Sequence, residues 1–352
     1  MKRVKVLALI AAMVMLLSAC NAINVTKVAN IGDVTAQKPE FMYYLEMAKS
    51  EAYQLAQAEG NIIQKDADWD TVMVEGKTAA QYAKDKALDS LKMILTLESK
   101  AKAAGFEMEN AETEIATHKN DMIEQMGGRY GYEQTLSKIG VDLDAFNAII
   151  ARSVYANAYM QKMAAEEAYQ PSPEAAKEKY DKEYVFVRHI LISNQAPQDE
   201  LIVDEEAAEP VDYAAEAKTE AEDILKKLSE GADFVALMNE HSDDGRGEDG
   251  KLSSDGYIMT NNGQMVPEFE EAAMKLEVGA YTTELVETTY GYHIIKRYEL
   301  PQTGTQYDET IAQITSTLLG ENVKNQVYAW ADELGFTVNE KFVSKQKIKM
   351  EE

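Results

Sequence analysis

The sequence predicts an α+β fold, in which a small module of strands and helices is inserted in otherwise all-α sequence. The chain has 352 residues, which is enough for two or three domains. Apolar residues recur every three or four positions over residues 39–182 and again from about residue 305, a spacing typical of amphipathic helices. Between these stretches, residues 184–192 form one run of apolar and β-branched residues, which predicts a buried strand.

Start and stop signals divide the first stretch into separate helices. Pro39 fits the first turn of a helix, because its missing N–H would have no partner there. Gly105 fits the end of a helix, Asp142 can cap the start of one, and Pro171 breaks the helix that precedes it. The expected elements are a short strand at 25–28 and helices at about 39–60, 78–104, 111–126, 132–139, 142–170 and 172–182.

The inserted module combines strand and helix signals. Gly231 follows one helical pattern and fits its C-terminal cap. Several glycines favour a loop over residues 245–263, and Pro267 fits the start of a short helix. The expected order is a strand at 184–192, helices at 214–229 and 234–241, the loop, a helix at 267–276, a strand at 291–296 and a long helix from about 305.

The start of the chain has the features of an exported protein. Three basic residues at positions 2, 3 and 5 precede an uncharged apolar stretch over 6–19, which is typical of a secretory signal peptide. The stretch ends in Leu17-Ser18-Ala19-Cys20, and Cys20 is the only cysteine. Small residues directly before a cysteine resemble the lipobox of bacterial lipoproteins. This resemblance implies that residues 1–19 are removed and that Cys20 carries lipid, which would tether the protein to the outer face of the cell membrane.

Composition excludes several other classes of protein. There are 35 basic and 61 acidic residues, a net charge of -26, which argues against sequence-independent binding of nucleic acid. A single cysteine cannot form an intramolecular disulfide, and four scattered histidines leave no pattern for a structural metal. No apolar run reaches the roughly 20 residues of a membrane span. We therefore expect neither a metal nor another cofactor.

The module carries four short motifs in a fixed order. They are the segments 188–191, 231–234 with 242–243, 263–269, and 291–296. Together they resemble parvulin-type (PpiC-like) peptidyl-prolyl cis-trans isomerases, whose fold is a small antiparallel sheet with surrounding helices. A signal peptide, a helical N-terminal region, this module and a helical C-terminal region also make the whole chain similar to PrsA-type foldase lipoproteins.

The resemblance assigns roles to seven residues of the module. It implies that His189 and His293 face each other on adjacent strands as a hydrogen-bonded pair, and that Asp244 acts beside them. Without it, each histidine would be interpreted as a buried residue of an apolar strand, and Asp244 as a turn residue. The residues implied around the substrate proline ring are Leu252, Tyr257, Met265 and Phe269.

One part of the module departs from the family pattern. Residues 250–256 read Gly-Lys-Leu-Ser-Ser-Asp-Gly, where the family commonly has a Gly-Gly-Asp-Leu-Gly run. The resemblance therefore does not define the conformation of this loop or the position of Tyr257. The sequence therefore leaves a non-catalytic or weakly catalytic peptide-binding chaperone as an alternative to an isomerase. A third alternative is an adhesin or solute-binding lipoprotein that uses the same fold.

The resulting domain organisation has four parts. We expect a signal peptide at 1–19, a helical chaperone-like domain at 20–182, the isomerase domain at 183–301, and a C-terminal helix with a tail at 302–352 that packs on the N-terminal domain. The implied partners are X-Pro segments of unfolded or newly secreted polypeptides, and the membrane through Cys20. The sequence leaves a homodimer open.

Overall fold

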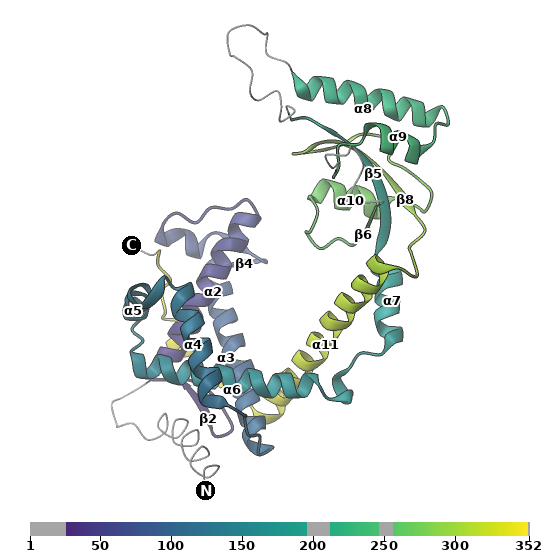
Figure 1. The fold of residues 1–352 in the computed structure, drawn as a ribbon. Coiled ribbons are helices and arrows are strands. Elements are labelled where there is room, and N and C mark those ends of the chain that lie inside the picture. Colours follow the sequence, from purple (N-terminus) through teal and green to yellow (C-terminus); the bar gives the residue numbers. More distant parts are fainter. Residues whose placement is uncertain (1–25, 196–211, 246–255, 351–352) are drawn as a thin grey trace. The chain divides into compact units, whose positions relative to one another are not determined.

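The computed structural model describes residues 26–195, 212–245 and 256–350 (Figure 1). The chain divides into two compact units. Unit 1 contains the residues up to Gln170 and those from Leu319 onward, whereas unit 2 contains Pro171–Leu318. Unit 2 is thus an insertion in the sequence of unit 1. Among the described residues, no helix has the length and apolar character that crossing a bilayer requires.

Unit 1 is mainly helical. Two of its long helices begin at side-chain caps, because Thr78 accepts from the backbone N–H of Gln81 and Asp142 accepts from that of Ala145. The α-helices are α2 (Lys38–Ala58), α3 (Ala79–Ala103), α4 (Ala111–Gln125), α5 (Gly128–Ile139), α6 (Leu143–Ala164), the second half of α11 (Thr305–Leu334) and α12 (Glu340–Val343). The short 3-10 helices are η1 (Asp66–Asp70) and η2 (Glu167–Tyr169).

Unit 1 also contains short strands. A three-stranded antiparallel sheet has the order β2-β1-β9, and β3 and β4 form a hairpin. These strands are β1 (Lys27–Ile31), β2 (Val34–Gln37), β3 (Met73–Val74), β4 (Lys77–Thr78) and β9 (Thr337–Val338). The sequence indicates only a strand at 25–28, because strands of two to five residues are too short to show an alternating pattern.

The core of unit 1 joins early and late segments of the described chain. Phe41 and Leu91, from α2 and α3, pack in one cluster with Val343 of α12. In a second cluster, Tyr159 of α6 packs with Val327 of α11. The segment from Leu319 onward therefore supplies core side chains to helices that lie more than 150 residues earlier in the sequence.

A buried ion cluster links three helices of unit 1. Arg152 of α6 contacts Glu40 of α2 through Nη1 and Oε2 at 2.5 Å, and contacts Glu98 of α3 through Nε and Oε2 at 2.7 Å. Lys102 pairs with the second oxygen of Glu98 at 2.6 Å. Burial raises the pKa of Glu40, and Arg152 opposes this rise. The guanidinium is therefore the main compensation for two carboxylates held away from water.

Unit 2 is a four-stranded antiparallel sheet with helices on both faces (Figure 1). The strand order is β6-β5-β8-β7. Apolar residues of α8 and α9 pack on one face against Ile190 and Ile294, whereas Phe269 of α10 packs on the other face against Val187 and Ile295. The elements are β5 (Val185–Ser193), α8 (Tyr213–Ser229), α9 (Phe234–His241), β6 (Tyr257–Met259), α10 (Pro267–Lys275), β7 (Val286–Thr288) and β8 (Gly291–Tyr298).

The boundary of unit 2 lies outside the expected module at 183–301. Helix α7 (Pro173–Glu183) belongs to unit 2, although the sequence analysis placed it with the N-terminal helices. Its residue Tyr180 is fully buried, packs with Ile314 in the first half of α11, and donates a hydrogen bond to the carbonyl of Pro301 at 2.7 Å. These contacts hold α7 and the start of α11 together beside the module.

Replacing Arg152 tests the buried cluster. We expect Arg152→Met to lower the free energy of unfolding by about 3–5 kcal/mol, because Glu40 would keep its burial without its arginine partner and buried Glu98 would be left with Lys102 alone. The measurement is urea unfolding of the parent and the variant. Arg129→Met is the matched control, since the Arg129 side chain is 85% exposed and forms a surface ion pair with Glu133. Equal effects of the two substitutions would contradict the structural role of the cluster.

Candidate isomerase site

The floor of the site is the pairing of β5 with β8. In the antiparallel register His189 lies opposite Ile295, and Leu191 lies opposite His293. The two histidines are therefore two residues apart along the ladder and lie on the same face of the sheet. Their ring centroids are 5.2 Å apart. Two positions that are 104 residues apart in the sequence thus become neighbours.

Glycine is required where β8 begins. Gly291 has a φ of +138°, and a Cβ atom there would lie 2.1 Å from the carbonyl oxygen of Ile192. Only glycine permits this close approach of the two strands. Gly291 pairs with Ser193 at the end of the ladder between β5 and β8. This pairing sets the register in which His293, two residues further along β8, lies beside His189.

Helix α10 supplies the apolar wall of the site. The ring of Phe269 meets His189 edge-on at 5.0 Å and His293 at 5.4 Å between centroids. Met265 packs in the same cluster as Phe269. Its loop is fastened by buried Glu270, whose two oxygens accept from the backbone N–H groups of Met265 at 3.0 Å and Gly263 at 3.1 Å. Glu270 therefore positions the loop that carries Met265. The sequence analysis did not identify it, because the motif there ends at residue 269.

Asp244 is placed by the residues that precede it. Ser242 Oγ accepts from the backbone N–H of Leu191 at 3.1 Å, and the N–H of Asp243 donates to the Leu191 carbonyl at 2.8 Å. These bonds fasten the end of α9 to the edge of β5 where β6 has ended. Asp244 Oδ2 then lies 3.6 Å from His189 Nε2 and accepts a hydrogen bond of 2.5 Å from the Tyr257 hydroxyl.

Both histidines are held in the neutral form. Burial lowers the pKa of His189, and the carboxylate of Asp244 opposes this shift. Burial, with a smaller contribution from His189, lowers the pKa of His293 to about 4. Neither Nδ1 atom has a hydrogen-bond partner among the described residues. The hydrogen bond that the sequence analysis expected between His189 and His293 is therefore not formed through either Nδ1 atom. The two rings are in contact instead.

Thr288 fixes one side of the histidine pair. Its Oγ1 lies 2.9 Å from His293 Nε2 and accepts from the backbone N–H of Tyr290 at 3.1 Å. Thr288 is buried at the end of β7, next to the two-residue turn into β8. The only sequence feature that could have indicated this role is the position of Thr288 five residues before His293. Threonine is common in strands, so this position alone does not distinguish a positioning residue from an ordinary strand residue.

Most of the expected site residues come together on the α10 face of the sheet. His189, Asp244, Tyr257 and Phe269 are linked by the contacts above, with the Tyr257 ring stacked 5.7 Å from that of His189. The strand β6 that carries Tyr257 lies within the region expected to be a loop. The sequence-predicted sites Leu252 and Cys20 lie outside the described residues.

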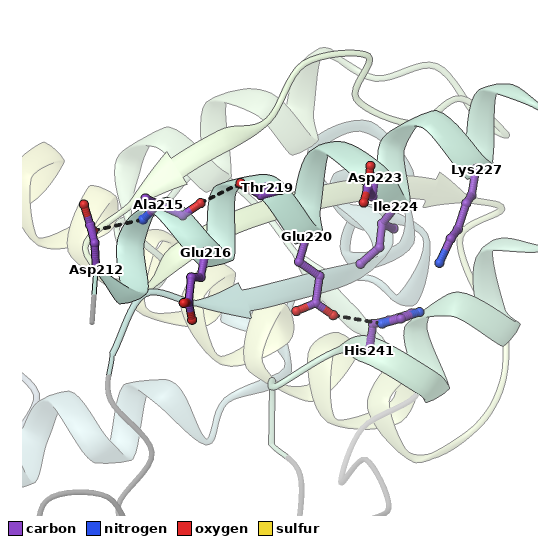
Figure 2. Close-up of a pocket in the computed structure, with 9 residues that line it drawn as sticks. All are labelled: Asp212, Ala215, Glu216, Thr219, Glu220, Asp223, Ile224, Lys227 and His241. Carbon is purple, nitrogen blue, oxygen red and sulfur yellow. Dashed lines mark hydrogen bonds and ion pairs between the residues drawn. The ribbon is translucent and has the colours of Figure 1, made fainter. Parts of the chain in front are cut away.

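A separate cleft of about 510 Å³ lies along α8. Figure 2 shows its lining, in which Glu220 points to His241 of α9 and bonds to its Nδ1 at 2.9 Å. Ile224 of the same helix packs against the face of the sheet that carries Ile190, opposite to the face of the histidine pair. The cleft is therefore not part of the histidine site. It is lined by Asp212, Ala215, Glu216, Thr219, Glu220, Asp223, Ile224, Lys227 and His241.

Comparison with known proteins places the site in a family. Residues 189–299 match the family model of the rotamase, PPIC-type PPIase domain. This part of the chain is a PPIC-type PPIase domain. The match confirms the parvulin-type domain expected from the four motifs, and it includes both histidines, Asp244 and the residues of α10.

Curated relatives support the wider resemblance to PrsA-type foldases. Identity is 41% over 122 residues with foldase protein PrsA of Caldanaerobacter subterraneus, which covers 34% of this chain and 37% of the relative. It is 39% over 95 residues with PrsA of Pediococcus pentosaceus, covering 26% and 31%, and 34% over 149 residues with chaperone SurA of Chromohalobacter salexigens, covering 42% and 30%. The chain spans about a third of the length of these relatives.

Solved structures of PrsA proteins are also similar to the chain. The crystal structure of PrsA from Bacillus subtilis has 23% identity and a TM-score of 0.26, and the match covers 76% of this chain and 87% of that one. PrsA from Streptococcus pneumoniae has 18% identity and a TM-score of 0.34, covering 82% and 99%.

Removing the Thr288 hydroxyl tests its role as a positioning residue. We expect Thr288→Val to lower kcat/KM for isomerisation of a prolyl peptide about tenfold, since His293 Nε2 and the Tyr290 N–H would each lose a partner. The pH at which activity is half-maximal should shift as well, because His293 Nε2 would lose its hydrogen-bond partner. Thr289→Val, at the exposed neighbouring position, should change neither quantity. A loss of stability with unchanged kinetics would assign Thr288 to the fold alone.

The histidine pair should make stability depend on pH. An unfolded chain takes up a proton at histidine near the ordinary pKa of 6.5, whereas folding lowers the pKa of His293 to about 4. The unfolded state therefore binds more protons between these values, so this contribution to stability is present above about pH 6.5 and is lost as pH falls toward 4. Thermal unfolding between pH 7 and 4.5 should show a shallower decline for His293→Gln than for the parent. Parallel declines would contradict the assignment.

Proposed function

We propose that the protein is a peptidyl-prolyl cis-trans isomerase and foldase that acts on X-Pro bonds of unfolded or newly secreted polypeptides. The observation that carries this proposal is the histidine pair, which lies against Phe269 on one face of the sheet, inside the segment that matches the PPIC-type domain. The PrsA and SurA names of the curated relatives support it.

The chemistry of the site suits rotation about an amide bond. Rotation crosses a barrier of about 18–20 kcal/mol because resonance is lost in the twisted state, but no bond breaks and no cofactor is needed. Phe269 and Met265 would hold the proline ring in apolar contact. In the twisted state the lone pair is localised on the amide nitrogen. A neutral imidazole of His189, whose Nε2 lies on the side of Asp244, would donate an N–H to it.

Asp244 would complete the site with a negative charge. Its side chain is one third exposed, whereas the His189 side chain beside it is 7% exposed. A carboxylate at this place would favour the amide in the form whose carbonyl carbon carries more positive charge, which is the twisted form. Tyr257 would hold the carboxylate in place through its hydroxyl.

We also propose that the protein acts outside the cytoplasm, held at the membrane by lipid on Cys20. The support is the signal-like sequence that ends at the only cysteine. Cys20→Ala should leave an unprocessed precursor or release the protein from the membrane fraction. Intact-mass analysis of the membrane-bound protein should find the mass of a lipid on a chain that begins at Cys20. An unmodified N-terminus at another residue would contradict the anchor.

A non-catalytic or weakly catalytic peptide-binding chaperone is the second candidate. It is favoured by residues 250–256, where the sequence departs from the family pattern close to Tyr257. A tetrapeptide assay of proline isomerisation, run beside an assay of client aggregation, separates the two candidates. A chaperone of this kind would suppress aggregation with little or no measurable turnover of the tetrapeptide.

Two substitutions test catalysis directly. We expect His189→Ala and Asp244→Ala each to lower kcat/KM for the tetrapeptide at least tenfold, because each removes a polar group beside the rotating bond. Suppression of aggregation should remain largely intact in both. His118→Ala is the matched control, because His118 lies on α4 in unit 1 and should leave turnover unchanged. Full turnover in both site variants would refute the proposed mechanism.

A further inference from the structure

Strand β6 connects the isomerase site to two helices that lie outside the segment matching the PPIC-type model. It is an edge strand of the sheet in unit 2. Tyr257 and Met259 pack on the α10 face, whereas Ile258, between them, packs with residues of α7 and α11. Both helices lie outside residues 189–299 of the family match. A strand of three residues makes few ladder hydrogen bonds, so its other neighbours help to decide where Tyr257 lies.

The first turn of α11 is bonded to the start of β6. Gln306 Nε2 donates to the carbonyl of Gly256 at 3.1 Å, one residue before Tyr257. Gly256 itself lies close against β5, because a Cβ atom there would be 2.6 Å from the carbonyl oxygen of Val187. The backbone that leads into Tyr257 is therefore in contact with both β5 and α11.

The side chain of Ile258 holds β6 on the face opposite to Tyr257. It packs in one apolar cluster with Tyr180 of α7, which is fully buried, and with Tyr307 and Ile311 of α11. The rings of Tyr180 and Tyr307 meet edge-on at 5.1 Å between centroids, and α7 lies beside the first half of α11 (Figure 1). All these residues belong to unit 2. The two helices therefore support β6 within one compact unit.

Tyr257 connects β6 to the reacting groups. Its hydroxyl donates to Asp244 Oδ2 at 2.5 Å, and its ring stacks 5.7 Å from that of His189. The same carboxylate oxygen lies 3.6 Å from His189 Nε2. A shift of β6 would move the hydroxyl, and a hydrogen bond weakens steeply when its geometry is lost. The place of Asp244 beside His189 thus depends on where β6 is held.

We infer that Gln306 and Ile258 are positioning residues for the isomerase reaction, and that α7 and the first half of α11 are part of the working isomerase. Gln306 acts through the Gly256 carbonyl, and Ile258 acts through its packing on the two helices. Both set the place of Tyr257 and, through its hydroxyl, that of Asp244. The inference rests on the proposed isomerase function. It extends the functional unit to helices that none of the four sequence motifs includes.

An isosteric substitution tests the hydrogen bond of Gln306. Gln306→Glu keeps the size of the side chain but replaces the donor by a carboxylate, which repels the Gly256 carbonyl. We expect kcat/KM for the prolyl tetrapeptide to fall about threefold, mainly through kcat, because Asp244 acts on the twisted amide. Gln313→Glu adds the same charge at an exposed position of the same helix and should leave kcat/KM unchanged. Equal effects of the two substitutions would overturn the role of Gln306.

A double-mutant cycle tests whether Gln306 acts through Tyr257. Tyr257→Phe keeps the ring and removes the hydroxyl that bonds to Asp244. In this background Gln306→Glu should change kcat/KM by less than about 1.5-fold, because the interaction that it disturbs is already absent. The full effect of Gln306→Glu in the Tyr257→Phe background would contradict an action through Tyr257.

A pair of truncations within one apolar cluster tests the packing of Ile258. Ile258→Ala and Leu318→Ala both remove side-chain volume from this cluster, and both should lower stability toward urea. Leu318 lies twelve residues beyond Gln306 along α11, which is about 18 Å. Only Ile258→Ala should lower kcat/KM of the folded protein. Equal kcat/KM values for the two variants would mean that the cluster serves the fold alone.

The ring signals of the histidines in NMR spectra separate this inference from the proposed function. The Tyr257 ring is stacked on His189, so its ring current contributes to the chemical shifts of the His189 ring protons. Gln306→Glu and Ile258→Ala should move these shifts, whereas the signals of His118, on α4 of unit 1, should stay in place. Unmoved His189 signals in both variants would overturn the inference. Absence of turnover in the parent would refute the proposed function, and the shifts would still test the place of Tyr257.

Discussion

The antiparallel register between β5 and β8 is the constraint on which the isomerase site depends. Side chains alternate along a strand, so a slip of one residue would turn His189 or His293 toward α8 and remove it from contact with Phe269. The apolar pattern opposes such a slip, because Ile190 and Ile294 would then leave the core beneath α8. The packing of the core and the geometry of the site therefore select the same register.

Burial at this site does two things at once. It places imidazole rings against the Phe269 ring, and it favours their uncharged form by withdrawing water from them. Asp244 keeps one third of its side chain exposed and meets His189 from the rim. The carboxyl group thus lies at the more exposed edge of the site, and the two imidazole rings lie buried behind it. The buried cluster of Arg152 in unit 1 differs, because there opposite charges compensate one another without water.

Sequence reasoning reached those parts of the site that lie in contiguous motifs. His189, His293 and Phe269 stand at motif positions on elements with clear strand or helix patterns, and the structure places them in contact. Thr288 and Glu270 were missed because their roles come from hydrogen bonds to atoms that only the folded chain brings near. The pairing of β1 with β9 was missed for a similar reason, since two residues at 337–338 contain no pattern from which a strand could be inferred. The motifs indicated which groups are present, but not which backbone atoms fasten them.

The long helix α11 has a consequence for the order of folding. Its first half packs with α7 in unit 2, and its second half completes the core of unit 1. Strand β9, only three residues after the helix ends, pairs with β1 near the beginning of the described chain. During synthesis the core of unit 1 can therefore be completed only after the segment from Leu319 onward has been made. All residues of unit 2 precede that segment in the sequence. Completing the core of unit 1 therefore requires the closure of a loop that spans most of the described chain, and contacts of such long sequence separation form more slowly than local ones.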